Sequence, residues 1–260
     1  KSFIPHVLPL FLEGYVRALK ITKSESAARS IWNQVRQSSL FDKKLKMYKL
    51  NAPLSAAPLE IGRAKGFTSG WLENGSIWMH MEYKYLLELL ENNLFDEFYE
   101  DFYHCLIPFQ DPKQYGRPTI ENSSFICSSA YPDKKLHGNG FYARLSGSTA
   151  EFLHIWILLM VGKHPFYMND QNQLCLQFRP KLSKYLFTQE NTIEFKFLSS
   201  CNIIYHNPNQ RNTYEDCSIE KIRIWDMHEL CREIQDNMIP EPYSTQVREG
   251  KIAKIEVFFT

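Results

Sequence analysis

The 260-residue sequence has no Cys-x-x-Cys pair, no excess of either charge and no apolar run long enough to cross a bilayer. Its six cysteines are scattered, which excludes the usual zinc and redox spacings and favours reduced thiols in a cytoplasmic protein. With 30 Lys and Arg against 29 Asp and Glu, the charge gives no reason to expect nucleic acid or a membrane surface as a partner. The longest apolar run, residues 152–161, is too short for a membrane span.

Motifs of several common enzyme classes are missing as well. The sequence contains no Walker loop, no dinucleotide-binding glycine fingerprint and no Ser-His-Asp elbow, so we expect neither a cofactor nor a metal. The composition, 44% hydrophobic and 14% aromatic, is that of a folded globular chain. Aromatic rings at this level suit a packed core, and they equally suit stacking on sugars.

The first part of the chain has the apolar spacing of amphipathic helices. Helices are predicted over residues 1–20, 27–35, 79–90, 95–106 and 152–161. Capping boxes at Thr22–Glu25 and Ser148–Glu151 are expected to start two of them. The last helix is apolar nearly all round, so we expect it to be buried. Prolines interrupt the pattern after residue 108, and a long irregular loop of functional type is expected up to residue 144.

From Phe166 onward the apolar period changes from 3.6 to 2, which predicts strands in an antiparallel sheet or sandwich. Alternation is clearest over residues 174–178, 193–197, 222–224 and 255–259. The sequence therefore predicts a mixed α+β fold. Residues 1–165 form a helical domain that carries the site, and residues 166–260 form a β-rich domain.

A glycine-punctuated stretch, residues 62–80, is the strongest candidate for a pocket-lining loop. Glycine allows sharp turns and close approach of a ligand to the backbone. The stretch ends with Glu73 and Asn74 and leads to His80 in the first turn of a helix. There an imidazole and free backbone N–H groups could hold an anion, although the spacing alone favours a core or capping histidine.

Ser146 and Gly147 precede the predicted buried helix, where a hydroxyl and N-terminal amides could cradle a phosphate. An ordinary N-cap formed by Ser148 and Glu151 would also explain this segment. A third candidate is the pair Asp133 and His137, which could act in acid–base chemistry or simply form a turn.

Residues 73–80, Glu-Asn-Gly-Ser-Ile-Trp-Met-His, resemble the Glu-Asn-Gly-Gly-Ile-Phe-x-His segment of inverting glycoside phosphorylases of the cellobiose-phosphorylase type. Residues 145–150, Leu-Ser-Gly-Ser-Thr-Ala, resemble the Thr-Gly-Thr-Ala segment of that family. The resemblance covers most of residues 62–166 and, more weakly, the β-rich tail. It implies the C-terminal part of an (α/α)6 barrel followed by an antiparallel β-sheet cap.

The resemblance also implies roles for individual residues. Phosphate would be bound by His80, Ser146 and Gly147, and the sugar by Glu73, Asn74, Ser128 and Glu121. Inorganic phosphate, as co-substrate, would attack the anomeric carbon of a disaccharide or oligosaccharide and release a sugar 1-phosphate with inversion. The family's general acid is an aspartate upstream of the Glu-Asn-Gly segment, and no matching segment occurs here. We therefore expect an N-terminal part of the same polypeptide to supply it, and these residues alone to be inactive.

Some positions depart from the family pattern. Leu72 stands where a polar or basic residue can occur, and Ser76 replaces the second glycine, which indicates a linkage or chain-length preference other than that of cellobiose enzymes. Two other classes remain open: a carbohydrate-binding or scaffolding module without activity, and a glycoside hydrolase on the same barrel. The hydrolase would need two carboxylates, from Glu73 and either Glu121 or Asp133. A homodimer is also left open.

Overall fold

The structure is a computed structural model that describes residues 7–143, 147–227 and 229–260. Its fold class is α+β, as predicted. The chain divides into two compact units, residues 1–155 and 156–260. The division falls inside helix α6 (Gly147–Met160), whereas the sequence places the boundary near Phe166, where the strands begin.

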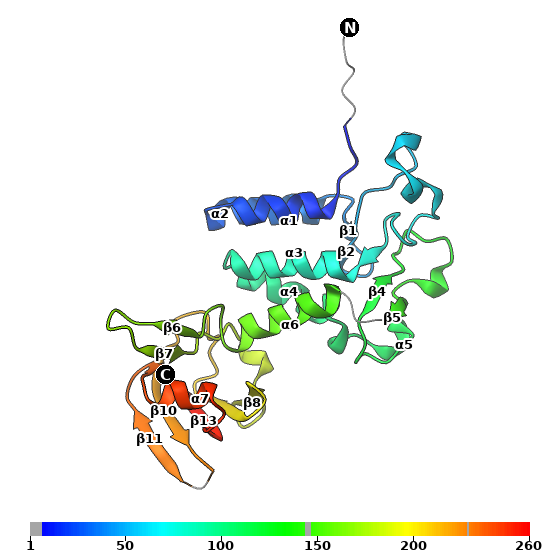
Figure 1. Cartoon of the computed structure of the whole chain (residues 1–260). Coiled ribbons are helices and arrows are strands. Elements are labelled where there is room, and N and C mark those ends of the chain that lie inside the picture. Colours follow the sequence, from blue (N-terminus) through cyan, green and yellow to red (C-terminus); the bar gives the residue numbers. More distant parts are fainter. Residues whose placement is uncertain (1–6, 144–146, 228) are drawn as a thin grey trace. The chain divides into compact units, whose positions relative to one another are not determined.

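The first unit is built on a set of packed helices. They are α1 (Leu12–Ile21), α2 (Glu25–Gln37), α3 (Met79–Glu91) and α4 (Phe95–Cys105). Helix α3 is the central one, because it packs against α1 and also against α4 (Figure 1). Its predicted apolar stripe, Met79, Tyr83, Leu86, Leu87 and Leu90, is buried. The predictions for α3 and α4 are confirmed, and the link of residues 92–94 between them is short.

Three helix starts were predicted at the wrong residue. Residues 1–6 of the predicted first helix lie outside the described residues. Helix α1 begins at Leu12, because Phe11 has an extended backbone and forms a β-bridge with Asn51. The N-cap of α2 is Ser24, whose Oγ accepts the N–H of Ala27 at 3.3 Å, and not Thr22, which ends α1. Helix α6 begins at Gly147, so Ser148 lies inside the helix and is not its N-cap.

The prediction that α6 is buried on all sides is also wrong. Leu153 is 55% exposed and Ile157 is 50% exposed, whereas Ile155 and Leu159 are fully buried. The apolar period of this helix therefore does not identify its solvent-facing side, because apolar residues occupy both sides.

The stretch expected to be irregular between residues 108 and 144 contains regular structure. Its elements are η3 (Ile107–Phe109), α5 (Pro112–Tyr115), β4 (Ser123–Ile126), η4 (Lys134–Leu136) and β5 (Gly140–Ala143). The earlier residues add β1 (Phe41–Asp42), β2 (Met47–Tyr48), η1 (Leu59–Ile61), η2 (Arg63–Gly66) and β3 (Ile77–Trp78). Both β3 and β5 pair antiparallel with β4, in the order β3-β4-β5.

This small sheet determines where two helices start. Because both outer strands are antiparallel to β4, β3 and β5 run in the same direction. Strand β3 continues directly into α3, and residues 144–146 separate β5 from α6. The N-termini of α3 and α6 therefore emerge at the same end of the sheet.

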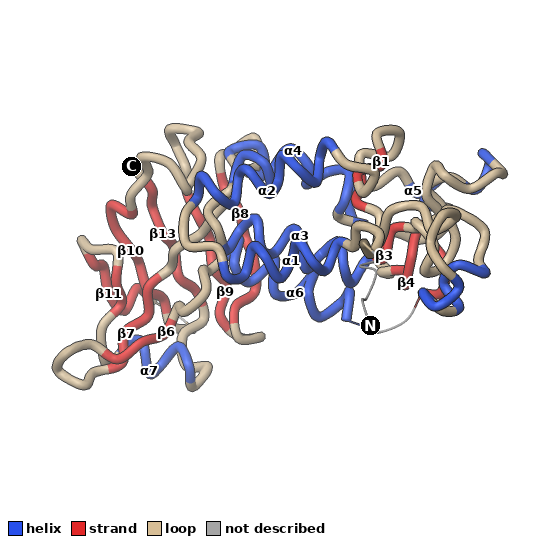
Figure 2. Tube along the Cα trace, turned by 90° about the horizontal axis from the view of Figure 1, so that it is seen from above, coloured by secondary structure: helices blue, strands red, loops and turns tan. Residues whose placement is uncertain are grey.

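The described residues of the second unit form two sheets (Figure 2). One has the order β11-β10-β13-β9-β8 and the other the order β12-β7-β6. The strands are β6 (Phe166–Met168), β7 (Leu174–Gln177), β8 (Thr192–Phe197), β9 (Cys201–His206), β10 (Ile219–Trp225), β11 (Leu230–Ile234), β12 (Met238–Ile239) and β13 (Lys254–Phe259). The described part of this unit also holds two short helices, η5 (Lys184–Leu186) and α7 (Tyr243–Arg248), and residues 156–160 at the end of α6.

Most strand pairs of the second unit are antiparallel, as predicted, but β13 and β9 are parallel. The alternation itself is confirmed, since Ile203, Tyr205, Ile255 and Val257 are fully buried on one face of the larger sheet. The six cysteines, all of them within the described residues, are free thiols. Among the described helices, none combines the length and apolarity that a membrane crossing requires.

Candidate functional site

The glycine-rich loop before α3 is held in one conformation by hydrogen bonds. The N–H of Gly70 donates to the carbonyl oxygen of Asn74 at 2.7 Å. The side chain of Asn51 accepts from the N–H of Gly75 at 2.7 Å and donates to the carbonyl of Glu73 at the same distance. These hydrogen bonds fix the backbone on both sides of Glu73, so the position from which its side chain extends is defined.

Two of the predicted sugar-binding residues help to hold this loop. Ser128 is fully buried, and its Oγ donates to the carbonyl of Gly75 at 2.6 Å. Asn74 is 6% exposed, and its Nδ2 donates to the carbonyl of Phe67 at 2.7 Å. These hydrogen bonds of Ser128 and Asn74 are made to the protein backbone. The role in sugar binding stays a prediction for both residues.

The two predicted carboxylates for sugar binding lie in ion pairs. Glu73 is paired with Arg63, and its side chain is 24% exposed. Glu121 is more exposed and lies 3.4 Å from Nη2 of Arg117. Either carboxylate would have to exchange an arginine for sugar hydroxyl groups, and the more enclosed Glu73 is the better placed of the two.

His80 and Gly147, predicted to share an anion site, lie against each other. His80 is the second residue of α3, and Gly147 is the first residue of α6. A Cβ atom built on Gly147 would lie 2.5 Å from Nδ1 of His80 and 2.6 Å from Nε2. Only glycine therefore allows the imidazole ring to approach the start of α6 so closely. Ser146, the third predicted phosphate ligand, lies outside the described residues.

Glu151 is a neighbour of this pair that the sequence assigned only to a helix cap. Its Oε1 lies 3.5 Å from Nε2 of His80, and its side chain is 19% exposed. The carboxylate can therefore orient the ring across the first turn of α6. The side chain of His80 remains 42% exposed, so a small solute can reach the imidazole.

Asp133 and His137 form hydrogen bonds with other residues and not with each other. Asp133 caps η4 by accepting the N–H of Lys135 at 3.0 Å. The ring nitrogens of His137 lie 2.7 Å from Nζ of Lys44 and 2.7 Å from the carbonyl of Tyr131. These contacts favour the turn interpretation of Asp133 over an acid–base pair.

The sequence did not predict a group of buried carboxyls in the helical core. Glu82 is fully buried, its Oε1 accepts the backbone N–H of Tyr48 at 2.8 Å, and burial raises its pKa to about 8. Asp101 is 1% exposed, accepts from Tyr48 and Arg36, and has a pKa raised by burial to about 6. The signal was visible in the sequence, because Glu82 falls on the apolar face of α3, three residues after Met79.

Comparison with known proteins adds no assignment: no protein-family model matches the chain, and no curated protein matches it either.

Alanine at Gly70 should destabilise the loop more than alanine at Gly62. Both glycines have a left-handed φ, +84° at Gly70 and +90° at Gly62, so each substitution strains the backbone. A Cβ on Gly70 would also collide with the backbone of Tyr131, 2.9 Å from its Cα, whereas nothing lies within 4 Å at Gly62. Thermal unfolding should show a clearly lower Tm for Gly70→Ala. Equal Tm values for the two variants would contradict the close packing of this loop.

Proposed function

We propose that this chain forms the phosphate-binding side of an inverting glycoside phosphorylase of the cellobiose-phosphorylase type. In this proposal the helices of the first unit are the last helices of an (α/α)6 barrel, and the second unit is its β-rich cap. The intact enzyme is cytoplasmic and cleaves a β-glucoside or oligosaccharide with inorganic phosphate. The general-acid aspartate comes from a segment N-terminal to Lys1, and a homodimer is one possible assembly.

One observation carries the proposal: two segments that resemble the family's phosphate-binding motifs, 67 residues apart, meet at His80 and Gly147. Their contact follows from the parallel course of β3 and β5, each of which is followed by a helix. The first N–H groups of a helix have no partner within that helix, and together with the helix dipole they favour an anion. The 14 residues of α6 make a helix long enough for this effect.

In the proposed reaction the protein has to orient the phosphate and does not have to supply a general base. In inverting hydrolysis a carboxylate activates water, whereas phosphate is already a nucleophile. His80 and the amide groups at the start of α6 would hold the anion on the face of the sugar opposite the leaving group. Glu151, 3.5 Å from the ring, keeps the imidazole directed along α6. Glu73 would bind hydroxyl groups of the acceptor sugar.

Replacing His80 with alanine should weaken phosphate binding by the 260-residue chain about tenfold or more, the loss expected for a charge-assisted hydrogen bond. Phosphate titration by isothermal calorimetry or ³¹P NMR measures this. His154→Ala is the matched control, because His154 is an exposed histidine of α6. In the intact enzyme, His80→Ala should raise the KM for phosphate much more than the KM for the acceptor sugar.

Equal losses in the two variants, or no phosphate binding by the parent chain, would contradict the proposed role of His80. The isolated chain should release no sugar 1-phosphate from oligosaccharides, and robust turnover would contradict the proposed position of the general acid. A chain that binds oligosaccharide but not phosphate would instead be the binding module considered as the alternative.

A further inference from the structure

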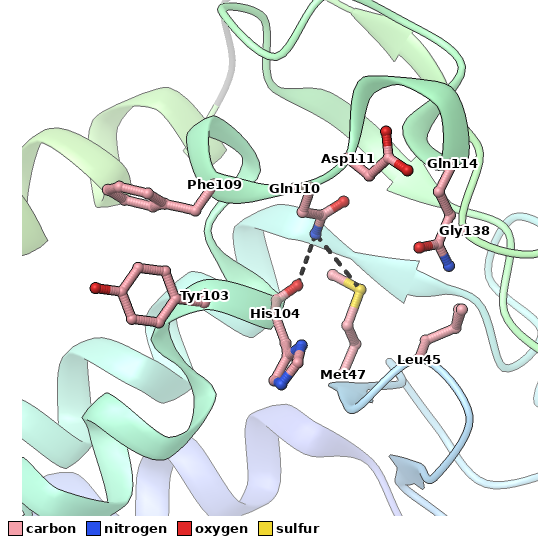
Figure 3. Close-up of a pocket in the computed structure, with 9 residues that line it drawn as sticks. All are labelled: Leu45, Met47, Tyr103, His104, Phe109, Gln110, Asp111, Gln114 and Gly138. Carbon is pink, nitrogen blue, oxygen red and sulfur yellow. Dashed lines mark hydrogen bonds between the residues drawn. The ribbon is translucent and has the colours of Figure 1, made fainter.

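A second candidate site lies in the first unit and shares no residue with the sites described above. A cavity of about 280 Å³ is lined by residues from the β1–β2 hairpin, the end of α4, the segment that leads into α5, α5 itself and the loop at Gly138 (Figure 3). Its lining residues are Leu45, Met47, Tyr103, His104, Phe109, Gln110, Asp111, Gln114 and Gly138. None of them was predicted as a site residue.

An aromatic pair forms one side of the cavity. Tyr103 is 46% exposed and Phe109 is 38% exposed, and their ring centroids lie 5.5 Å apart in an edge-to-face arrangement. Phe102, fully buried, packs on the inner side of Phe109 with ring centroids 4.6 Å apart. The buried ring of Phe102 therefore helps to fix the aromatic pair in place, while Tyr103 and Phe109 expose apolar surface to solvent. Such a surface suits a ligand with an apolar face.

Polar groups on the other side are already oriented. Nε2 of Gln110 donates to the carbonyl of His104 at 2.7 Å, which fixes the carboxamide in place (Figure 3). Asp111 accepts the N–H of Lys113 at 2.9 Å as the N-cap of α5. The side chain of Gln114 lies against Gly138, where a Cβ would come within 2.8 Å of its Cγ. Polar groups that are held before binding lose little entropy when a ligand arrives.

The residues that line the cavity carry no cationic lysine or arginine for an anionic ligand. Asp111 is the one acidic residue among the nine, and they include no lysine or arginine. Burial, together with the nearby cations of Lys46 and Arg36, lowers the pKa of His104 and so favours the neutral form of its imidazole. A phosphate or other anion would face a carboxylate here and would gain no compensating cation from the lining residues.

We propose that this cavity binds a single neutral sugar ring, with the C–H face of the ring packed against the edge-to-face pair of Tyr103 and Phe109 and its hydroxyl groups on Gln110, Asp111 and Gln114. Carboxamides and carboxylates offer the donors and acceptors that adjacent hydroxyl groups need. A volume of about 280 Å³ is at the small end of ligand sites, which suits one ring and not an oligosaccharide. The proposal is independent of the phosphate site, since the two share no residue.

The test is binding of methyl β-D-glucopyranoside and a panel of other methyl glycosides to the 260-residue chain, without phosphate, by saturation-transfer NMR and titration. At least one glycoside of the panel should bind, and Tyr103→Ala should weaken its binding about tenfold, as expected for loss of an aromatic contact surface. Asp111→Asn should weaken binding too, and it retains the N-cap because asparagine caps helices equally well. Tyr185→Ala, which removes a tyrosine that is 76% exposed in the second unit, is the matched control.

Binding that survives in His80→Ala but is lost in Tyr103→Ala would support the proposal, whatever the phosphate experiments show. Failure of every glycoside in the panel to bind would overturn it. Binding of choline in place of the sugars would also overturn it, because an aromatic pair beside a carboxylate would then be a cation site. Equal binding by Tyr103→Ala and Tyr185→Ala would show that the sugar binds elsewhere.

Discussion

Alanine in place of Gly147 should remove most of the phosphate affinity of the chain while leaving α6 folded. The added Cβ would lie 2.5 Å from two atoms of the His80 ring, so the imidazole must leave the start of the helix. Alanine favours helical backbone more than glycine does, and His80 is partly exposed, so the ring can move at little cost to the fold. Phosphate affinity measured by calorimetry should fall to about the level of His80→Ala, a loss on the order of tenfold or more.

Gly14→Ala is the control for this substitution. Gly14 also lies in a helix, α1, and nothing is found within 4 Å of the position a Cβ would take. This variant should bind phosphate as the parent does and should be slightly more stable, by about 0.5–1 kcal/mol. Unchanged phosphate binding in Gly147→Ala would mean that contact between the ring and α6 has no part in holding the anion.

Glutamine in place of Glu82 should flatten the dependence of stability on pH. The folded-state pKa of about 8 lies above the unfolded value near 4.5, so the folded chain keeps a proton that the unfolded chain releases. The stability from this group is complete below about pH 4.5 and is lost as the pH rises to about 8, by about 1.4 kcal/mol per pH unit. Asp101 adds a smaller loss that ends near pH 6.

Urea unfolding at pH 5, 6.5 and 8 measures this effect, with pulsed hydrogen exchange of α3 peptides reporting on the unit that holds Glu82. The difference between the parent and Glu82→Gln isolates this carboxyl from the other titrating groups. Glu190→Gln changes an exposed glutamate of the second unit and serves as the control. Identical pH slopes for the parent and Glu82→Gln would contradict a protonated Glu82 in the core.

Helices α3 and α4 were the easiest elements to predict, because apolar residues recur at helical spacing along both. Burial of α3 extends beyond the predicted stripe, to Tyr85, Glu88 and Leu89. The strands β4 and β5 were missed. Residues 123–126 are buried at every position and show no alternation, and both strands are only four residues long. A pattern of period 2 arises only where one face of a strand contacts water, as in β13 of the second unit.

The residues of the candidate site could be predicted from the sequence, but their arrangement in space could not. The motif resemblance identified His80 and Gly147, whereas their contact depends on β3 and β5 running parallel through a strand that the sequence did not reveal. Glu151 was interpreted as part of a capping box because Ser148 was taken as the N-cap, whereas α6 already begins at Gly147. The parallel pairing of β13 with β9 could not be predicted from the sequence either. In a half-exposed sheet, apolar and polar residues alternate in the same way whether neighbouring strands are parallel or antiparallel.

A crystal structure of the chain grown or soaked in phosphate is the most direct measurement. We expect tetrahedral density within hydrogen-bonding distance of the His80 imidazole and the first amide groups of α6, and no such density in His80→Ala crystals treated in the same way. An empty position there in the parent crystals, or phosphate bound only at other surfaces, would contradict an anion site formed by these two helix starts.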